Sequence, residues 1–169
     1  MNRDEMLAEP RRGLDQIKQV LENDLGFQYV EGKDMSIGVG LGVAWSETDF
    51  LTLSVSLGSP SNLYITGGIY RDIPQNRLPA LEAVNSLNQD NPAYTAFLHD
   101  AEIGWDLLLQ QCLPIQLFVD IPPFLGACLQ PTLGRIEEAR EKCRELGVAG
   151  TGYRWVSDDL ERLLQTSLI

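Results

Sequence analysis

The spacing of hydrophobic and polar positions predicts a helix followed by three short strands in the first half of the chain. Apolar side chains recur at helical spacing over residues 13–25, and Gly26 stands where a helix commonly ends. Residues 36–45, 51–57 and 63–70 then alternate with the period of a β-strand, and the pair Gly67 and Gly68 predicts a bulge in the third strand. Because the connections are too short for parallel crossovers, we expect an antiparallel meander over about residues 36–70.

The second half of the chain returns to a helical period and then predicts a hairpin and further helices. A helix is expected over residues 77–89, a hairpin over 94–103 and 105–113, and a helix over 135–146 that ends at Gly147. Residues 118–133 predict a short helix that begins at a proline pair and stops before Pro131. Ser157 can cap a last amphipathic helix. The apolar stripes of these helices are expected to include Leu14, Ile17, Leu78, Leu81, Val84, Leu87, Ile136, Ala139, Cys143 and Leu146 in the main domain, and Leu160, Leu163, Leu164 and Leu168 in the last helix.

These elements predict an α+β fold, with an antiparallel meander sheet and helices in the order α-βββ-α-ββ-α, plus a C-terminal helix. The length of 169 residues suits one domain. We expect a polar N-terminal lead over residues 1–12, a single domain over 13–146, and a linker with an amphipathic helix over 147–169.

Glycine occupies one face of the first predicted strand. Gly38, Gly40 and Gly42 alternate with large apolar residues, so that one side of the strand is nearly bare backbone. Bare backbone weakens a strand unless another element approaches it closely. The three glycines are therefore candidates for an interface, covered either by another element or by a second subunit.

The charge of the chain argues against nucleic acid and membranes as partners. Thirteen Lys and Arg against twenty-four Asp and Glu give a formal net charge of −11, which repels phosphate backbones and anionic lipid surfaces. No apolar run approaches the roughly 20 residues of a membrane span. The first twelve residues carry charges where a secretory signal would be apolar, so a cytoplasmic location is expected.

The sequence offers no constellation of residues for catalysis, metal binding or cofactor binding. His99 is the only histidine, and no nucleophile motif accompanies it. The glycine-rich stretch at residues 38–42 lacks the third glycine and the following helix of a dinucleotide-binding loop. The three cysteines have no paired spacing, and Cys112 and Cys143 are expected to be small buried hydrophobic residues in reduced form. We therefore expect no enzyme activity, no cofactor and no metal.

One segment resembles a known family. Residues 81–88, with Asn85 and Asn88 at helical spacing, are similar to the asparagine-bearing central helix of the YbjN-like family of bacterial proteins. The order of elements over residues 13–146 also resembles the fold of type III secretion chaperones. The resemblance implies a small acidic binding or regulatory protein, related in fold to dimeric chaperones, with no catalytic residues to carry over. Asn85 and Asn88 could pair across a two-fold axis, or could simply form local hydrogen bonds.

Together these features predict a non-catalytic binding module that forms a homodimer and presents sheet and helix surface to a protein or peptide partner. The alternatives are an enzyme or a small-ligand protein with a pocket lined by Trp45, Trp105 and Trp155, and a purely structural subunit.

Overall fold

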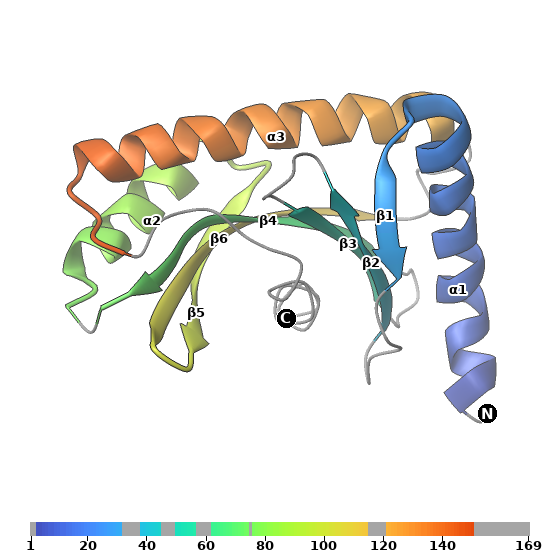
Figure 1. Cartoon of the computed structure of the whole chain (residues 1–169), viewed down its shortest axis with the longest axis horizontal. Coiled ribbons are helices and arrows are strands. Elements are labelled where there is room, and N and C mark those ends of the chain that lie inside the picture. Colours follow the sequence, from blue (N-terminus) through green and yellow to red (C-terminus); the bar gives the residue numbers. More distant parts are fainter. Residues whose placement is uncertain are drawn as a thin grey trace.

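The computed structural model describes residues 3–31, 38–44, 50–56, 62–74, 76–114 and 121–150. Within these ranges it contains three helices and six strands (Figure 1). In chain order the elements are α1 (Arg3–Val20), the π-helical turn η1 (Leu21–Leu25), β1 (Gln28–Glu31), β2 (Gly38–Ala44), β3 (Phe50–Ser56), β4 (Asn62–Ile73), α2 (Leu78–Asp90), β5 (Thr95–Ala101), β6 (Gly104–Pro114) and α3 (Ile121–Glu145).

The strands form one antiparallel sheet in the order β1-β2-β3-β4-β6-β5. The predicted α+β class, the meander and the hairpin are therefore confirmed. The register shifts between Gly68 and Tyr70, which confirms the predicted bulge. Strand β1 was not predicted, because its four residues are too few to show a period. The hairpin β5–β6 joins the sheet through β6, so β5 lies at one edge and β1 at the other.

Helix α1 begins earlier than the sequence pattern predicts. It starts at Arg3 and includes most of the expected polar lead, with Pro10 buried inside it. The lead lacks an apolar stripe but consists mainly of good helix formers. The helix that begins in the packed turns after it can therefore continue through the lead toward the N-terminus. Gly26 has a φ of 67°, so the helical segment ends as predicted in a left-handed residue.

Helix α3 is one continuous helix rather than the two predicted, and Pro131 lies inside it. The prediction that a helix stops before Pro131 is wrong. Proline removes one backbone hydrogen bond, but Pro131 is exposed, so water can satisfy the freed carbonyl group. The helix ends near Gly147, whose φ of 70° agrees with the predicted stop.

All three helices pack on the same face of the sheet, which we call the helix face. Figure 1 shows α3 running along the sheet, with α2 and α1 at opposite ends. The main hydrophobic core joins Ile17 of α1, Ala83 of α2 and Ile136 of α3 to inward-facing strand residues such as Leu53 and Ile65. A Cβ atom at Gly67 would lie 2.2 Å from Cδ1 of Ile136, so the glycine allows α3 to approach β4 closely.

The predicted stripes are confirmed on α1 and on most of α3 but not on α2. Leu14, Ile17, Ala139 and Cys143 are buried. Three predictions of burial are wrong: Leu78 is 61% exposed, and Leu81 and Leu146 are each 38% exposed. Helix α2 instead buries Ala80 and Ala83, whose small side chains allow the helix to lie close to β5, while Val84 is only partly buried. The expected helix after Ser157 lies outside the described residues.

Candidate interaction surface

The outward face of α2 carries exposed apolar side chains. Leu78 is 61% exposed and Leu81 is 38% exposed, and Asn85 is also exposed. Their spacing of three and four residues places them on one side of the helix, away from the buried Ala80 and Ala83. Exposed leucines that share one helix face make this side of α2 a candidate contact for another protein.

Asn88 has a structural role that fixes the position of this face. Its side-chain amide donates to the carbonyl oxygen of Ala96 at 3.0 Å, and its amide oxygen accepts from the N–H of Ala96 at 2.7 Å. Both polar groups of the side chain therefore bond to the backbone of β5 and dock α2 beside that strand. This is the local hydrogen bonding that the sequence left open as an alternative to pairing across a two-fold axis.

The β5–β6 hairpin adjoins the start of α2. A shallow groove of about 730 Å³ is lined by Arg77 and residues 100–105. The guanidinium carbon of Arg77 lies 4.4 Å from the centre of the Trp105 ring, a cation–π contact that joins helix and hairpin. Ile103 at the hairpin turn is 78% exposed. We call the outward face of α2 and this groove together the α2–hairpin surface, with Arg77, Leu78, Leu81, Asn85, Ile103 and Trp105 as its defining residues.

Strand β5 borders the same surface. Among the described strands it pairs only with β6. Asn88 already occupies the backbone N–H and C=O of Ala96, so the edge available to a partner is the part beyond Ala96, toward the hairpin turn. An extended peptide can add to such an edge by main-chain hydrogen bonds. His99 lies in this strand opposite Asp106 of β6, and is half-buried.

The predicted interface glycines lie elsewhere. Gly38, Gly40 and Gly42 belong to β2, which pairs with β1 on one side and β3 on the other. Gly40 and Gly42 are buried. Strands β3, β4 and β6 separate β2 from β5, so the structure does not bring these glycines together with Asn85 and Asn88.

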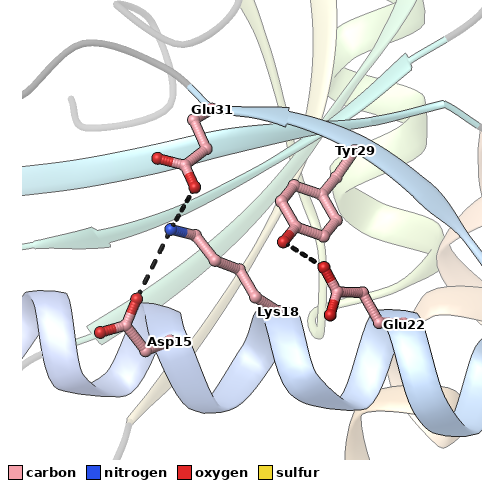
Figure 2. A network of polar contacts seen from close by, with 5 residues as sticks. All are labelled: Asp15, Lys18, Glu22, Tyr29 and Glu31. Atoms are coloured by element: carbon pink, nitrogen blue, oxygen red, sulfur yellow. Dashed lines mark hydrogen bonds and ion pairs between the residues drawn. The ribbon is translucent and has the colours of Figure 1, made fainter.

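A network of polar side chains attaches the other edge strand, β1, to α1 and η1 (Figure 2). The Lys18 ammonium group lies 2.7 Å from the Glu31 carboxylate and 3.5 Å from that of Asp15, and Tyr29 donates to Glu22 at 2.6 Å. Partial burial lowers the pKa of Lys18, but the hydrogen bond and charge of Glu31 outweigh it, so the net pKa is raised. The hydrogen bond to Glu22 raises the pKa of Tyr29. The carboxylates of this network are exposed, so these contacts hold the strand in place with only a small gain in stability.

A small cavity between α2 and α3 offers little room for a ligand. Its volume is about 80 Å³, whereas pockets for drug-sized ligands measure roughly 300–1,000 Å³. Ion pairs between Lys142 and Asp90 and between Arg135 and Glu138 border it. Trp105 lines the hairpin groove instead, and Trp45 and Trp155 lie outside the described residues. Within the described ranges, no three His, Cys, Asp or Glu side chains gather as metal ligands would.

The cysteines divide into one exposed and two buried residues. Cys143 is buried as predicted, and burial raises its pKa from 9.0 to about 12. Burial also raises the pKa of Cys128. The prediction that Cys112 is buried is wrong: it is exposed near the end of β6, where it faces away from the helices. Because thiolates react and buried neutral thiols do not, Cys112 is the thiol that solvent-borne reagents reach first.

Comparison with known proteins identifies the fold. No family profile matches the chain, and no curated protein matches it. A solved structure of YbjN from E. coli, described as a candidate transcription regulator, superposes with a TM-score of 0.56 at 17% identity. The match covers 80% of this chain and 93% of that one. Among the described residues no helix is long and apolar enough to cross a membrane. At this identity the likeness concerns architecture, and the chain has the YbjN-like fold that its central helix suggested.

Proposed function

We propose that this protein is a non-catalytic binding module, chaperone-like or regulatory, that works in the cytoplasm as a homodimer and binds a protein or peptide partner. The α2–hairpin surface carries the proposal, because Leu78 and Leu81 expose apolar area beside a groove and beside the part of the β5 edge that Asn88 leaves open. The fold shared with YbjN, which is described as a candidate transcription regulator, supports a regulatory role.

The outward face of α2 is the proposed contact between subunits. In a two-fold dimer the same patch meets its own copy, so Leu78 and Leu81 of one subunit would pack against those of the other. Asn85 lies on the same face and would fix the register of the two helices. Asn88 supports this contact indirectly, since its hydrogen bonds to Ala96 hold α2 in place.

The double substitution Leu78→Glu and Leu81→Glu is expected to convert a dimer into a monomer, because it places like charges opposite each other in the contact. Light scattering at micromolar concentration measures the mass. Leu146→Glu is the matched control, since Leu146 is as exposed as Leu81 but lies beyond the end of α3. It should leave the dimer intact. A monomeric wild-type protein, or a dimer that survives the double substitution, would contradict the dimer proposal.

The partner is expected to bind along the edge of β5 and the hairpin groove. Asp100 and Glu102 line that groove, and Ile103 projects from the turn, so a basic segment with an apolar anchor would fit it. Ile103→Asp should reduce capture of the partner from native lysate at least tenfold while the mass by light scattering stays unchanged. The Leu146→Glu protein should capture as much as the wild type. Equal capture by all three proteins would place partner binding elsewhere.

A further inference from the structure

The face of the sheet opposite the helices is buried, although no described helix packs on it. Side chains alternate between the two faces along each strand. Thr52 and Thr66 pair with each other, so they share this second face with every second residue of their own strands and with the residues directly opposite these. Each is at most 8% exposed. They are Phe50, Thr52, Ser54, Thr66, Asp106, Leu108 and Gln110. A sheet face turned to water would leave such side chains exposed.

The second face has its own hydrophobic cluster. Leu108 is 1% exposed and packs with Phe97, apart from the main core of the helix face. Polar groups on this face bond to one another: Gln110 donates to the Thr66 hydroxyl at 3.1 Å, and the Thr52 hydroxyl donates to the Thr66 carbonyl at 3.4 Å. The cover therefore need not supply partners for these hydrogen bonds and can itself be apolar.

The glycines of β2 make one side of this face flat. Gly40 pairs with Ser54 and Gly42 with Thr52, and all four residues are buried. Small side chains in adjacent strands leave a shallow surface on which a helix can lie close to the backbone. The sequence predicts that another element lies close to the bare backbone of these glycines. On the sheet, such an element would cover the second face.

The lengths of the segments outside the described residues indicate which of them is long enough to cover the second face. Each connecting stretch between described elements has at most six residues, whereas nineteen residues follow Gly150. The chain arrives there beside the sheet: Val148 is 7% exposed, and a Cβ atom at Gly150 would lie 2.7 Å from the carbonyl oxygen of Arg71, near the end of β4. The C-terminal segment therefore starts beside the end of β4, where Val148 joins the core of the helix face, and is long enough to pass the end of the sheet and cross the second face.

We propose that the chain's own C-terminal segment, residues 157–169, forms an amphipathic helix that lies on the second face of the sheet. Its leucines recur at helical spacing, at positions 160, 163, 164 and 168. Thirteen helical residues span about 20 Å. The four neighbouring strands β2, β3, β4 and β6 span about 15 Å at their usual separation. The leucine stripe would pack against Phe50 and Leu108 and on the flat glycine and threonine surface. This contact is separate from the α2–hairpin surface and leaves that surface free.

Paramagnetic broadening in the full-length protein tests this placement. Cys112 lies on the second face, opposite Tyr64 in β4, and is the exposed thiol among the three cysteines, so it can carry a nitroxide label. The label should remove most of the amide signal intensity of residues 157–169. A matched label is placed on the exposed side of α3 by the substitution Glu138→Cys in a protein that also carries Cys112→Ser. That label should leave the same signals largely intact.

Three further samples make the outcome decisive. Leu160→Asp with Leu164→Asp should release the segment and restore its signals beside the Cys112 label, whereas Glu161→Ala with Gln165→Ala should not. A mixture of labelled protein without ¹⁵N and unlabelled ¹⁵N protein should show no broadening. Sharp, unbroadened signals from residues 157–169 in the labelled wild type would overturn the proposal. Broadening in the mixture would overturn it too, because the cover would then come from a second copy.

Discussion

Replacing Gly104 with alanine is expected to lower the free energy of unfolding by about 3 kcal/mol, because the turn of the β5–β6 hairpin has no space for a side chain. Gly104 has a φ of 146°, a conformation that residues with a Cβ atom rarely adopt. A Cβ atom there would lie 2.2 Å from the carbonyl oxygen of Ile73. Since this neighbour is backbone of the paired strand β4, relief of the clash requires the hairpin and β4 to move apart.

Gly134→Ala is the matched control within the same chain. Gly134 lies in α3 and is exposed, and a Cβ atom at this position would have no heavy atom within 4 Å. Alanine in a helix interior should raise the free energy of unfolding by roughly 0.5–1 kcal/mol. Urea denaturation followed by circular dichroism measures both values. If Gly104→Ala were as stable as wild type, the tight contact between the hairpin turn and Ile73 would be absent.

Replacing Arg140 with alanine is expected to cost about 3 kcal/mol, because a fully buried side chain and its hydrogen bonds are lost together. Arg140 is 1% exposed. Its guanidinium group donates to the Gly68 carbonyl at 3.0 Å and to Glu137 at 2.6 Å. Gly68 borders the bulge in β4, where the regular pairing with β6 shifts. Arg140 thus donates a hydrogen bond to a backbone carbonyl group where the strand pairing is irregular. Its removal leaves that carbonyl group buried without this hydrogen bond.

Arg135→Ala in the same helix provides the comparison. Arg135 is 39% exposed and pairs with Glu138 on the surface, so its loss should change stability by less than about 1 kcal/mol. Arg140→Lys should fall between the two, since lysine keeps the charge but lacks the second arm of the guanidinium group. Denaturant titrations of the three proteins rank them. Equal stability of the Arg140→Ala and Arg135→Ala proteins would show that α3 does not depend on this contact with β4.

Local patterns were sufficient for most elements of the fold. Periods of two and of about three and a half residues located the meander, the hairpin and the helices, because alternation and helical spacing follow from backbone geometry alone. Gly26 and Gly147 marked helix ends, since few other residues tolerate a left-handed φ. Gly67 and Gly68 likewise marked the bulge. Strand β1 and the continuity of α3 past Pro131 escaped this reasoning, because a four-residue strand shows no period and an exposed proline can be accommodated by context.

The residues exposed on the candidate interaction surface could not be identified from local patterns and became clear only in the tertiary structure. The sequence located the central helix, but its apolar period could not tell which of its apolar residues face inward. Ala80 and Ala83 occupy the buried side because small side chains fit against β5, and this turns Leu78 and Leu81 outward. The sequence marked Asn88 as a candidate for pairing or for local hydrogen bonds. Only the structure shows that its side chain bonds to the backbone of Ala96 in β5.

By itself the sequence determined the class of fold, the sites of turns and the absence of a recognisable catalytic motif, because these follow from residue type and spacing. Only the tertiary structure decided which strands are neighbours, which side of α2 is exposed, and that Arg140 is buried beneath Gly68. Such features arise between residues far apart in the chain. Arg140 and Gly68 are separated by 72 positions, and no local period relates two residues at that distance.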